Sequence, residues 1–248
     1  MVNTRSKRVI KFGHVNTRSI LPSFLDVSDM ITQNVFDVFA VTETWLSSDI
    51  PSNLVNIAGY NFYRRDRDTR GGGVGVFVNS SFSCEMIILD PHMDEQKRHL
   101  EHMWLKINFG NTNIALGIIY RPPKGHLDQA IDCLDNIMSV LTPSFDHIMV
   151  MGDVNVNLFH MNNKISQCFD SYDMVQLITE PTRITRYTET LLDPIFTTNP
   201  ERCSSRGTLN TDIFSDHRLT FCEISFNIQK RKQKMVTFRD FKSFNIDR

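Results

Sequence analysis

The sequence predicts an α/β protein in which two mixed β-sheets pack face to face and helices cover the outside, a four-layered sandwich. Its 248 residues are 41% hydrophobic, which is enough to bury the core of one large domain. Short strand-like runs recur along the chain, outnumber the helical stretches and end in polar residues. Two packed sheets account for this pattern better than a doubly wound parallel sheet does.

The expected strands are short runs rich in β-branched and aromatic residues. They cover residues 9–12, 38–42, 73–78, 102–107, 114–120, 147–152, 193–197 and 219–225. Helices are expected at residues 20–31, 127–141 and 163–174. In the second helix the apolar residues fall on one stripe, as expected for a helix that covers a sheet, at Leu127, Ile131, Leu134, Ile137, Met138 and Leu141.

No repeat or low-complexity linker divides residues 1–228, so we expect one domain there. From Gln229 the sequence becomes a basic run that no core could use, followed by polar residues up to Arg248 without a helix-capping signal. We interpret residues 229–248 as a linker or tail. This pattern indicates a domain cut from a longer chain, with a natural tail as the alternative.

Composition excludes several classes of protein. The five cysteines are scattered and include no C-x-x-C pair, which predicts reduced thiols in a cytosolic or nuclear protein. The sequence contains no apolar run of membrane-spanning length and no signal peptide, so we expect neither membrane insertion nor secretion. The net charge of −1 does not by itself indicate nucleic-acid binding. A local patch has to supply any phosphate affinity.

Two basic segments are candidates for such a patch. The first holds Arg64, Arg65, Arg67 and Arg70, and the second is the run from Lys230 to Lys234. A solvated loop and a flexible tail are the structural alternatives for these segments.

Polar residues that suit phosphodiester hydrolysis follow several of the expected strands. This reaction needs a hard cation held by oxygens, a group that handles a proton, and donors for the charge on phosphorus oxygens. Glu43, with either Asp216 or Asp153, suits the cation. His217 can contact the phosphate or move a proton, and a buried aspartate such as Asp193 can fix its tautomer.

Neutral donors complete this set, because Asn155, Asn16 and Tyr120 can contact a phosphate without adding repulsive charge. Taken singly, each candidate also has a structural explanation as a strand end, a turn, a cap or a core histidine. Their joint occurrence favours a single site at one edge of the sandwich.

The same residues stand in short motifs that resemble the endonuclease/exonuclease/phosphatase superfamily in its usual order. The motifs are His14-Val-Asn-Thr-Arg-Ser19, Thr42-Glu-Thr-Trp-Leu46, Ile119-Tyr-Arg-Pro-Pro123, Gly152-Asp-Val-Asn155, Leu192-Asp193 and Ser215-Asp-His217. The Glu-Thr-Trp, Tyr-Arg-Pro-Pro and Gly71-Gly-Gly-Val-Gly75 stretches look more particularly like the apurinic-type endonuclease of LINE (non-LTR) retrotransposons, especially the jockey and CR1-like groups. This resemblance implies a DNase I-like fold and covers nearly the whole chain.

The resemblance implies a role for each site residue. Glu43 is expected to hold Mg²⁺, with Mn²⁺ as a substitute, and Asn16 and Asp216 are expected near the same cation. Asp153 is expected to assist proton transfer, and Asn155 to steady the phosphate.

His217, paired with Asp193, and Tyr120 are expected to contact the scissile phosphate. The residues expected to contact DNA are Arg64, Arg65, Arg67, Arg70 and Arg121. The residue that activates the water is left open.

Two positions depart from the expected pattern. Arg18 stands where repair-type apurinic endonucleases often carry an acidic residue, which argues against strong abasic-site activity. Pro194 follows Asp193 where a strand would continue, and proline removes a ladder donor. A bulge, an edge position or a degenerate element copy would each explain it.

The glycine-rich stretch and the two tryptophans each allow a structural and a functional interpretation. The glycines at 71–75 fit a turn into a strand better than a phosphate cradle, since the Lys-Ser/Thr of a P-loop is lacking. Trp45 and Trp104 could stack on bases, although single aromatics in apolar runs are more often core residues.

These observations lead to the hypothesis of a Mg²⁺-dependent DNA endonuclease. It nicks one strand of double-stranded target DNA in the nucleus after cytoplasmic synthesis. The resemblance to LINE elements implies that the nick leaves a 3′-hydroxyl, which primes reverse transcription by a covalently linked reverse transcriptase. The alternatives are a phosphodiesterase or phosphatase of the same fold with another substrate, and a catalytically dead DNA-binding module.

Overall fold

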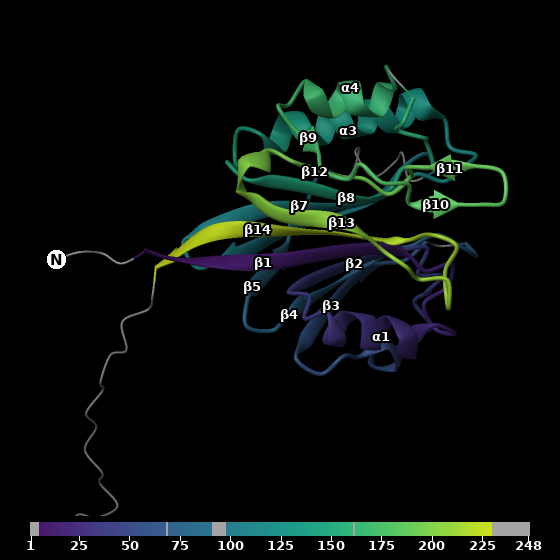
Figure 1. The fold of residues 1–248 in the computed structure, drawn as a ribbon, viewed down its shortest axis with the longest axis horizontal. Helices are drawn as coiled ribbons and strands as arrows, with labels where there is room; N and C mark the ends of the chain where they lie inside the picture. The colour runs from purple at the N-terminus through teal and green to yellow at the C-terminus, as the bar shows by residue number, and fades with distance from the viewer. Residues whose placement is uncertain (1–4, 68, 91–97, 161, 230–248) are drawn as a thin grey trace, which may run out of the picture.

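The computed structural model describes residues 5–67, 69–90, 98–160 and 162–229. Two six-stranded sheets pack face to face. Helix α1 (Phe24–Gln33) covers one sheet, and helices α3 (Leu127–Leu141) and α4 (Lys164–Asp170) cover the other (Figure 1). The layers therefore run helix, sheet, sheet, helix, which confirms the predicted four-layered sandwich.

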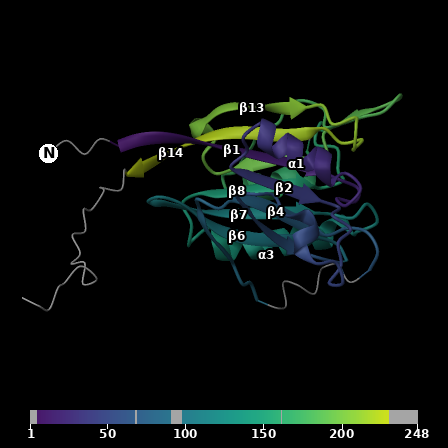
Figure 2. The same cartoon turned by 90° about the horizontal axis from the view of Figure 1, so that it is seen from below.

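The first sheet has the strand order β13-β14-β1-β2-β4-β3. In that order its strands are β13 (Cys203–Leu209), β14 (Leu219–Gln229), β1 (Arg5–Asn16), β2 (Val38–Thr42), β4 (Val74–Asn79) and β3 (Tyr60–Arg65). β1 and β2 are parallel, and the other neighbours are antiparallel. The long pair β1 and β14 lies along one side of the molecule (Figure 2).

The second sheet has the order β5-β6-β7-β8-β12-β9. Its strands are β5 (Ser83–Met86), β6 (Glu101–Phe109), β7 (Thr112–Tyr120), β8 (Ile148–Asp153), β12 (Ile195–Thr197) and β9 (Val175–Gln176). β7 and β8 are parallel because α3 connects them. A separate hairpin of β10 (Arg183–Ile184) and β11 (Glu189–Thr190) projects from one end of the sandwich (Figure 1).

In the described part of the chain, two short 3₁₀ helices lie in connections, η1 (Ser52–Val55) before β3 and η2 (Pro200–Arg202) before β13. Among the described residues, no helix is both long and apolar enough to cross a membrane. All five cysteines are free thiols, as expected.

The core between the sheets is built from side chains that alternate along the strands. Phe12 and Ile224 of the first sheet and Met103, Leu116 and Met151 of the second belong to one buried cluster. Burying each such side chain contributes roughly 1.5–3 kcal/mol, so this layer holds the sheets together.

The helices pack on the outer faces through the stripes that their spacing predicts. In α3, Leu134, Ile137 and Met138 are fully buried and belong to the same cluster as Trp104 and Ile119 of the second sheet. One face of each sheet thus meets the other sheet and the opposite face meets helices, which explains why most strands are apolar on both sides.

Most expected elements are present, but several boundaries differ. The helix at 127–141 and the strand at 38–42 have the predicted bounds. The strand expected at 193–197 begins only at Ile195, so the predicted start was wrong. Pro194 therefore precedes the ladder and removes no donor from it, because the chain is still turning at Asp193.

Sequence reasoning missed the two edge strands of the first sheet, β3 and β13. β3 ends in two arginines, and β13 consists mostly of small polar residues that are exposed or half-buried. The expected helix at 163–174 ends at Asp170, and the one at 20–31 begins at Phe24. β14 extends to Gln229, and residues 230–248 of the predicted tail lie outside the described residues, so the division into a domain at 1–228 and a tail at 229–248 stays a prediction.

Candidate active site

The carboxyl ends of four central strands meet at the end of the sandwich where hairpin β10–β11 lies (Figure 1). Asn16 ends β1, Glu43 follows β2, Tyr120 ends β7 and Asp153 ends β8. Both pairs of strands are parallel, so their ends share one edge. The two sheets face each other, and this brings the polar residues of both into one site.

Asn16 links the two sheets. Its amide Nδ2 donates to Glu43 Oε1 at 2.8 Å and to Asp153 Oδ2 at 2.9 Å. Glu43 Oε1 also accepts from the hydroxyl of Tyr120 at 3.1 Å. Burial, followed by the charge of Glu43, raises the pKa of Tyr120, so this phenol stays a proton donor.

His217 and Asp193 form a buried pair. His217 Nδ1 lies 2.8 Å from Asp193 Oδ2, and that oxygen also accepts from the hydroxyl of Thr182 at 2.6 Å. Burial acts to lower the pKa of His217, but the charges of Asp193, Asp153 and Asp216 outweigh it and the pKa is raised. The aspartate thereby favours the imidazolium and fixes the ring orientation, with Nε2 as the nitrogen that Asp193 does not hold.

Asp153 and Asn155 are set by an unusual turn after β8. Gly152 has a φ of 149°, and a Cβ there would lie 1.8 Å from the carbonyl oxygen of Ile119, so only glycine fits. Asn155, with a φ of 48°, donates from its backbone N to Asp153 Oδ1 at 2.8 Å and from Nδ2 to Oδ2 at 3.2 Å. Burial, and then the charge of Asp193, raises the pKa of Asp153.

The donor set at this edge suits a hard divalent cation. Glu43, half-buried, and Asp153 offer carboxylate oxygens on either side of the Asn16 amide. Atoms of Asp153, Asp193 and His217 also lie within 4.8 Å of one another. His217 Nδ1 already binds Asp193 Oδ2. Because Mg²⁺ prefers oxygen ligands and keeps part of its water shell, the partly open Glu43 side fits it better.

Asp216 lies at the rim and is held by two arginines. Its Oδ2 accepts from Arg183 Nε at 3.0 Å and Nη2 at 2.9 Å, and its Oδ1 lies 3.4 Å from Arg18 Nη1. Ser215 ties the same loop to the site by donating from Oγ to Asn16 O at 2.6 Å. No contact between Asp216 and Glu43 occurs within the described parts of the chain, so a cation shared by these two residues stays a prediction.

Most of the arginines expected to contact DNA bind the protein's own backbone. Arg64 Nη2 donates to Ile50 O at 2.6 Å, and Arg65 Nη1 donates to His102 O at 3.1 Å. Both lie in β3, not in a loop as expected. These guanidinium groups are committed to tertiary contacts, which corrects the picture of one DNA-facing arginine loop.

Arg67 and Arg121 are likewise occupied. Arg67 forms an ion pair with Glu101. Arg121 is 6% exposed and donates to the carbonyls of Val154 at 2.6 Å and Asn155 at 2.7 Å, so it shapes the loop that carries Asn155. Arg70 is exposed and is the member of the set best able to meet a ligand.

Three residues of the site were missed from the sequence. His14 is fully buried, contacts Thr42 Oγ1 at 3.0 Å, and burial lowers its pKa to about 4, so it is neutral beside Asp193. Its position two before Asn16 on a strand could have placed it on the same face. Thr182 and Arg183 stand in a polar stretch without strand periodicity, so the sequence gives no signal for them.

The Endonuclease/Exonuclease/phosphatase family profile matches residues 13–217, which include every residue of this site. The chain belongs to this family. Members of the family are usually phosphodiester or phosphoester hydrolases, and the match confirms the superfamily predicted from the motifs. A search of curated proteins finds no significant match.

Solved structures share the fold at low sequence identity. The endonuclease domain of TRAS1, a telomere-specific non-LTR retrotransposon, matches with a TM-score of 0.68 and 12% identity over 90% of this chain and 100% of that one. An AP endonuclease from Archaeoglobus fulgidus gives 0.66 and 16% over 87% and 99%. The 3′ phosphatase NExo from Neisseria, bound to product DNA hairpin, gives 0.69 and 12% over 88% and 100%.

Proposed function

We propose that this family member is a Mg²⁺-dependent DNA endonuclease that nicks one strand of a duplex and leaves a 3′-hydroxyl. One observation carries the proposal: the Asp193–His217 pair lies within reach of Asp153, which Asn16 joins to Glu43. The Asp193–His217 pair and the oxygen ligands for a hard cation can then act on the same phosphate group. The similarity to the TRAS1 endonuclease domain supports DNA as the substrate.

Each residue contributes a separate task. Glu43, with Asn16 and Asp153 beside it, would hold the cation, which would polarise the phosphate and stabilise its charge. His217 in its protonated form donates from Nε2 to a non-bridging oxygen of the phosphate. Asp193 keeps that ring charged and oriented.

Asp153 suits proton transfer, because burial raises its pKa towards neutrality and Asn16 and Asn155 fix its two oxygens. The hydroxyl of Tyr120 holds Glu43 in place. We further propose that the 3′-hydroxyl primes reverse transcription in the nucleus by a reverse transcriptase on the same polypeptide, as the sequence resemblance to LINE elements implies.

The test is a nicking assay on supercoiled plasmid with Mg²⁺ or EDTA. Wild type is expected to relax the plasmid only with Mg²⁺, and extension by a DNA polymerase is expected to show a 3′-hydroxyl at the nick. His217→Ala should slow nicking at least about 100-fold, because a positioned donor to the oxygen on which charge develops contributes on that scale. Glu43→Gln should slow it at least about 10-fold and raise the Mg²⁺ concentration needed.

The outcomes separate the remaining hypotheses. Folded wild type that leaves plasmid intact but removes a 3′-phosphate would move the assignment to a phosphatase of the same fold. Folded wild type that binds duplex DNA and hydrolyses neither substrate would make it a binding module. Equal nicking by wild type and His217→Ala would refute the proposed centre.

A further inference from the structure

The two tryptophans of the chain have opposite environments. Trp104 is 1% exposed and packs over Gly117, where an added Cβ would lie 2.6 Å from its ring. Trp45 is 36% exposed and stands two residues after Glu43. The structure thus separates two residues that the sequence treats alike: Trp104 is a core residue and Trp45 is not.

Trp45 is held in its exposed position by specific contacts. Its backbone has a φ of 54°, a left-handed conformation that residues other than glycine rarely adopt. Its backbone N donates to Gly72 O at 2.9 Å, and its indole Nε1 donates to Glu43 Oε2 at 3.3 Å. The ring is therefore fixed against a residue of the proposed cation site.

The loop that contacts Trp45 is itself anchored to the second sheet. Gly71, Gly72 and Gly73 all have positive φ values, of 89°, 66° and 85°, which lets their backbone approach closely. Glu101 accepts from Gly73 N at 2.6 Å and from the guanidinium of Arg67, and Gly73 O accepts from Thr44 N at 3.3 Å. These hydrogen bonds restrict the backbone conformation at the base of the glycine loop, residues 71–73.

Arg70 supplies a charge at the same place. Its guanidinium carbon lies 5.8 Å from the centroid of the Trp45 ring, within the range of a cation–π contact, and its side chain is exposed. An exposed aromatic ring and an exposed cation beside a phosphate site form the combination that contacts nucleotides, by stacking and by phosphate pairing. Large aromatic side chains are usually buried. A tryptophan whose only role was to hydrogen-bond Glu43 would therefore not need to be exposed to solvent.

We propose that Trp45 contacts the DNA substrate by stacking on a nucleotide next to the scissile phosphate, with Arg70 on a neighbouring phosphate. This inference rests on the proposed function and deepens it, because it names the side chains that position the strand. The glycine loop, residues 71–73, then has the role of holding the Trp45 ring at the edge of the site.

Intrinsic fluorescence tests the contact directly, because buried Trp104 contributes a constant background. Trp104→Phe carries Trp45 as its single tryptophan, and Trp45→Phe carries only Trp104. Each is titrated with a short DNA duplex in EDTA, and emission and acrylamide quenching are recorded. DNA should quench the Trp104→Phe emission and protect it from acrylamide, and should leave the Trp45→Phe emission unchanged.

Affinity supplies the second readout. Trp45→Ala should weaken duplex binding about tenfold in an electrophoretic shift assay, since stacking on one base contributes on that scale. Trp45→Phe should keep most of the affinity because phenylalanine still stacks. Circular dichroism shows whether each variant is folded, and Trp45→Phe keeps the test valid if Trp45→Ala is not.

The proposal is overturned if wild type nicks and binds DNA while the Trp45 emission stays constant and Trp45→Ala binds like wild type. It is also overturned if Trp45→Ala and Trp45→Phe nick equally slowly with unchanged affinity, because the indole would then act only through Glu43. DNA-dependent quenching in a protein that does not nick would uphold the contact and refute the endonuclease.

Discussion

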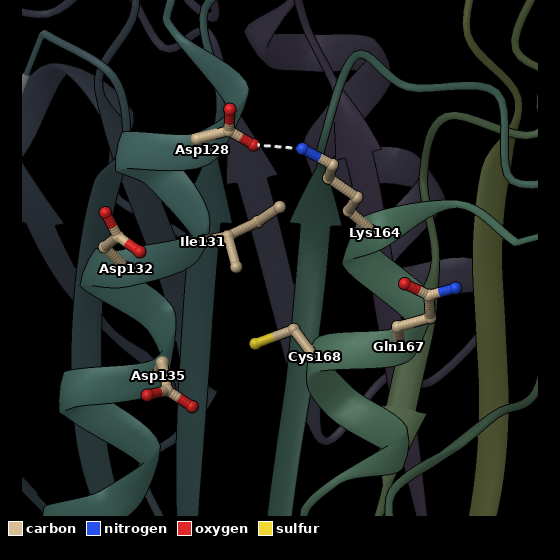
Figure 3. A pocket seen from close by; sticks show the side chains of 7 residues that line it. All are labelled: Asp128, Ile131, Asp132, Asp135, Lys164, Gln167 and Cys168. Carbon is tan, nitrogen blue, oxygen red and sulfur yellow. Dashed lines mark hydrogen bonds and ion pairs between the residues drawn. The ribbon is translucent and has the colours of Figure 1, made fainter.

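Two regions of the molecule gather carboxylates, and they do so in opposite ways. The groove between α3 and α4 is lined by Asp128, Asp132 and Asp135, all from one helix (Figure 3). The active-site edge gathers Glu43, Asp153 and Asp193 from three different segments. The first set follows from helical spacing alone, whereas the second set exists only because distant strand ends meet.

The surroundings of the two sets differ as much as their origin. Asp128 has a side chain 74% exposed and pairs with Lys164 at 2.5 Å, an ion pair in water. Asp153 and Asp193 are fully buried, and each accepts several protein hydrogen bonds. Burial, and then the charge of Asp193, raises the pKa of Asp153, so the number of acidic residues in a region is a poor guide to its chemistry.

The strongest test of this contrast replaces one carboxylate of each set by an amide. Asp193→Asn should slow plasmid nicking roughly 10³–10⁴-fold, because the charge that holds and orients His217 is lost. Asp132→Asn, the matched control in the groove, should nick at the wild-type rate. Equal rates for the two variants would show that the buried pair takes no part in the reaction.

The next largest effect is expected on the free energy of unfolding, which should depend more on the buried site than on the exposed surface. The hydroxyl of Thr182 donates to Asp193 and accepts from the backbone N of Leu192 at 2.9 Å and of Asp193 at 3.1 Å. Thr182→Val removes these partners inside the protein and should lower the free energy of unfolding by about 1–3 kcal/mol, measured by urea denaturation. Thr188→Val on the exposed hairpin tip should stay within about 0.5 kcal/mol. A Thr182→Val variant as stable as wild type would contradict the assigned network.

The smallest effect is expected in the groove. Lys164→Ala breaks the exposed ion pair with Asp128 and should change the free energy of unfolding by less than about 1 kcal/mol, with the nicking rate unchanged. Salt should weaken this contribution further, because the pair is solvated. A loss of nicking in Lys164→Ala would show that the groove is coupled to the active site and would break the contrast.

The local sequence pattern predicted strands that are apolar on both faces and helices that carry a regular apolar stripe. The stripe of α3 and the apolar run of β2 gave the observed bounds because burial and periodicity agree there. β13 was missed because its side chains are largely polar, and β3 because its aromatic residues run directly into two arginines. Both are edge strands, and an edge strand needs only one apolar face. Their pairing with β4 and β14 decides their structure.

The candidate site divides in the same manner. Glu43, Asp153 and His217 were predicted from strand-end position and from the resemblance. Arg64, Arg65 and Arg121 donate to backbone carbonyls. The sequence could not indicate this, because a guanidinium that binds carbonyls looks identical in sequence to one that binds phosphate, and their contact with DNA stays a prediction. Thr182 and Arg183 reach the site only through the hairpin fold.

The sequence by itself determined the fold class, the strand ends at which the candidate site residues stand and the family of this protein. The fold class depends on residue type and short-range periodicity, and the family was indicated by short motifs in a particular order; a linear sequence records both. The tertiary structure alone decided that Asn16 joins the two sheets, that Arg121 faces inwards and that Trp45, unlike Trp104, faces solvent. Such partners are distant in sequence, and only packing of the two sheets brings them within hydrogen-bond distance.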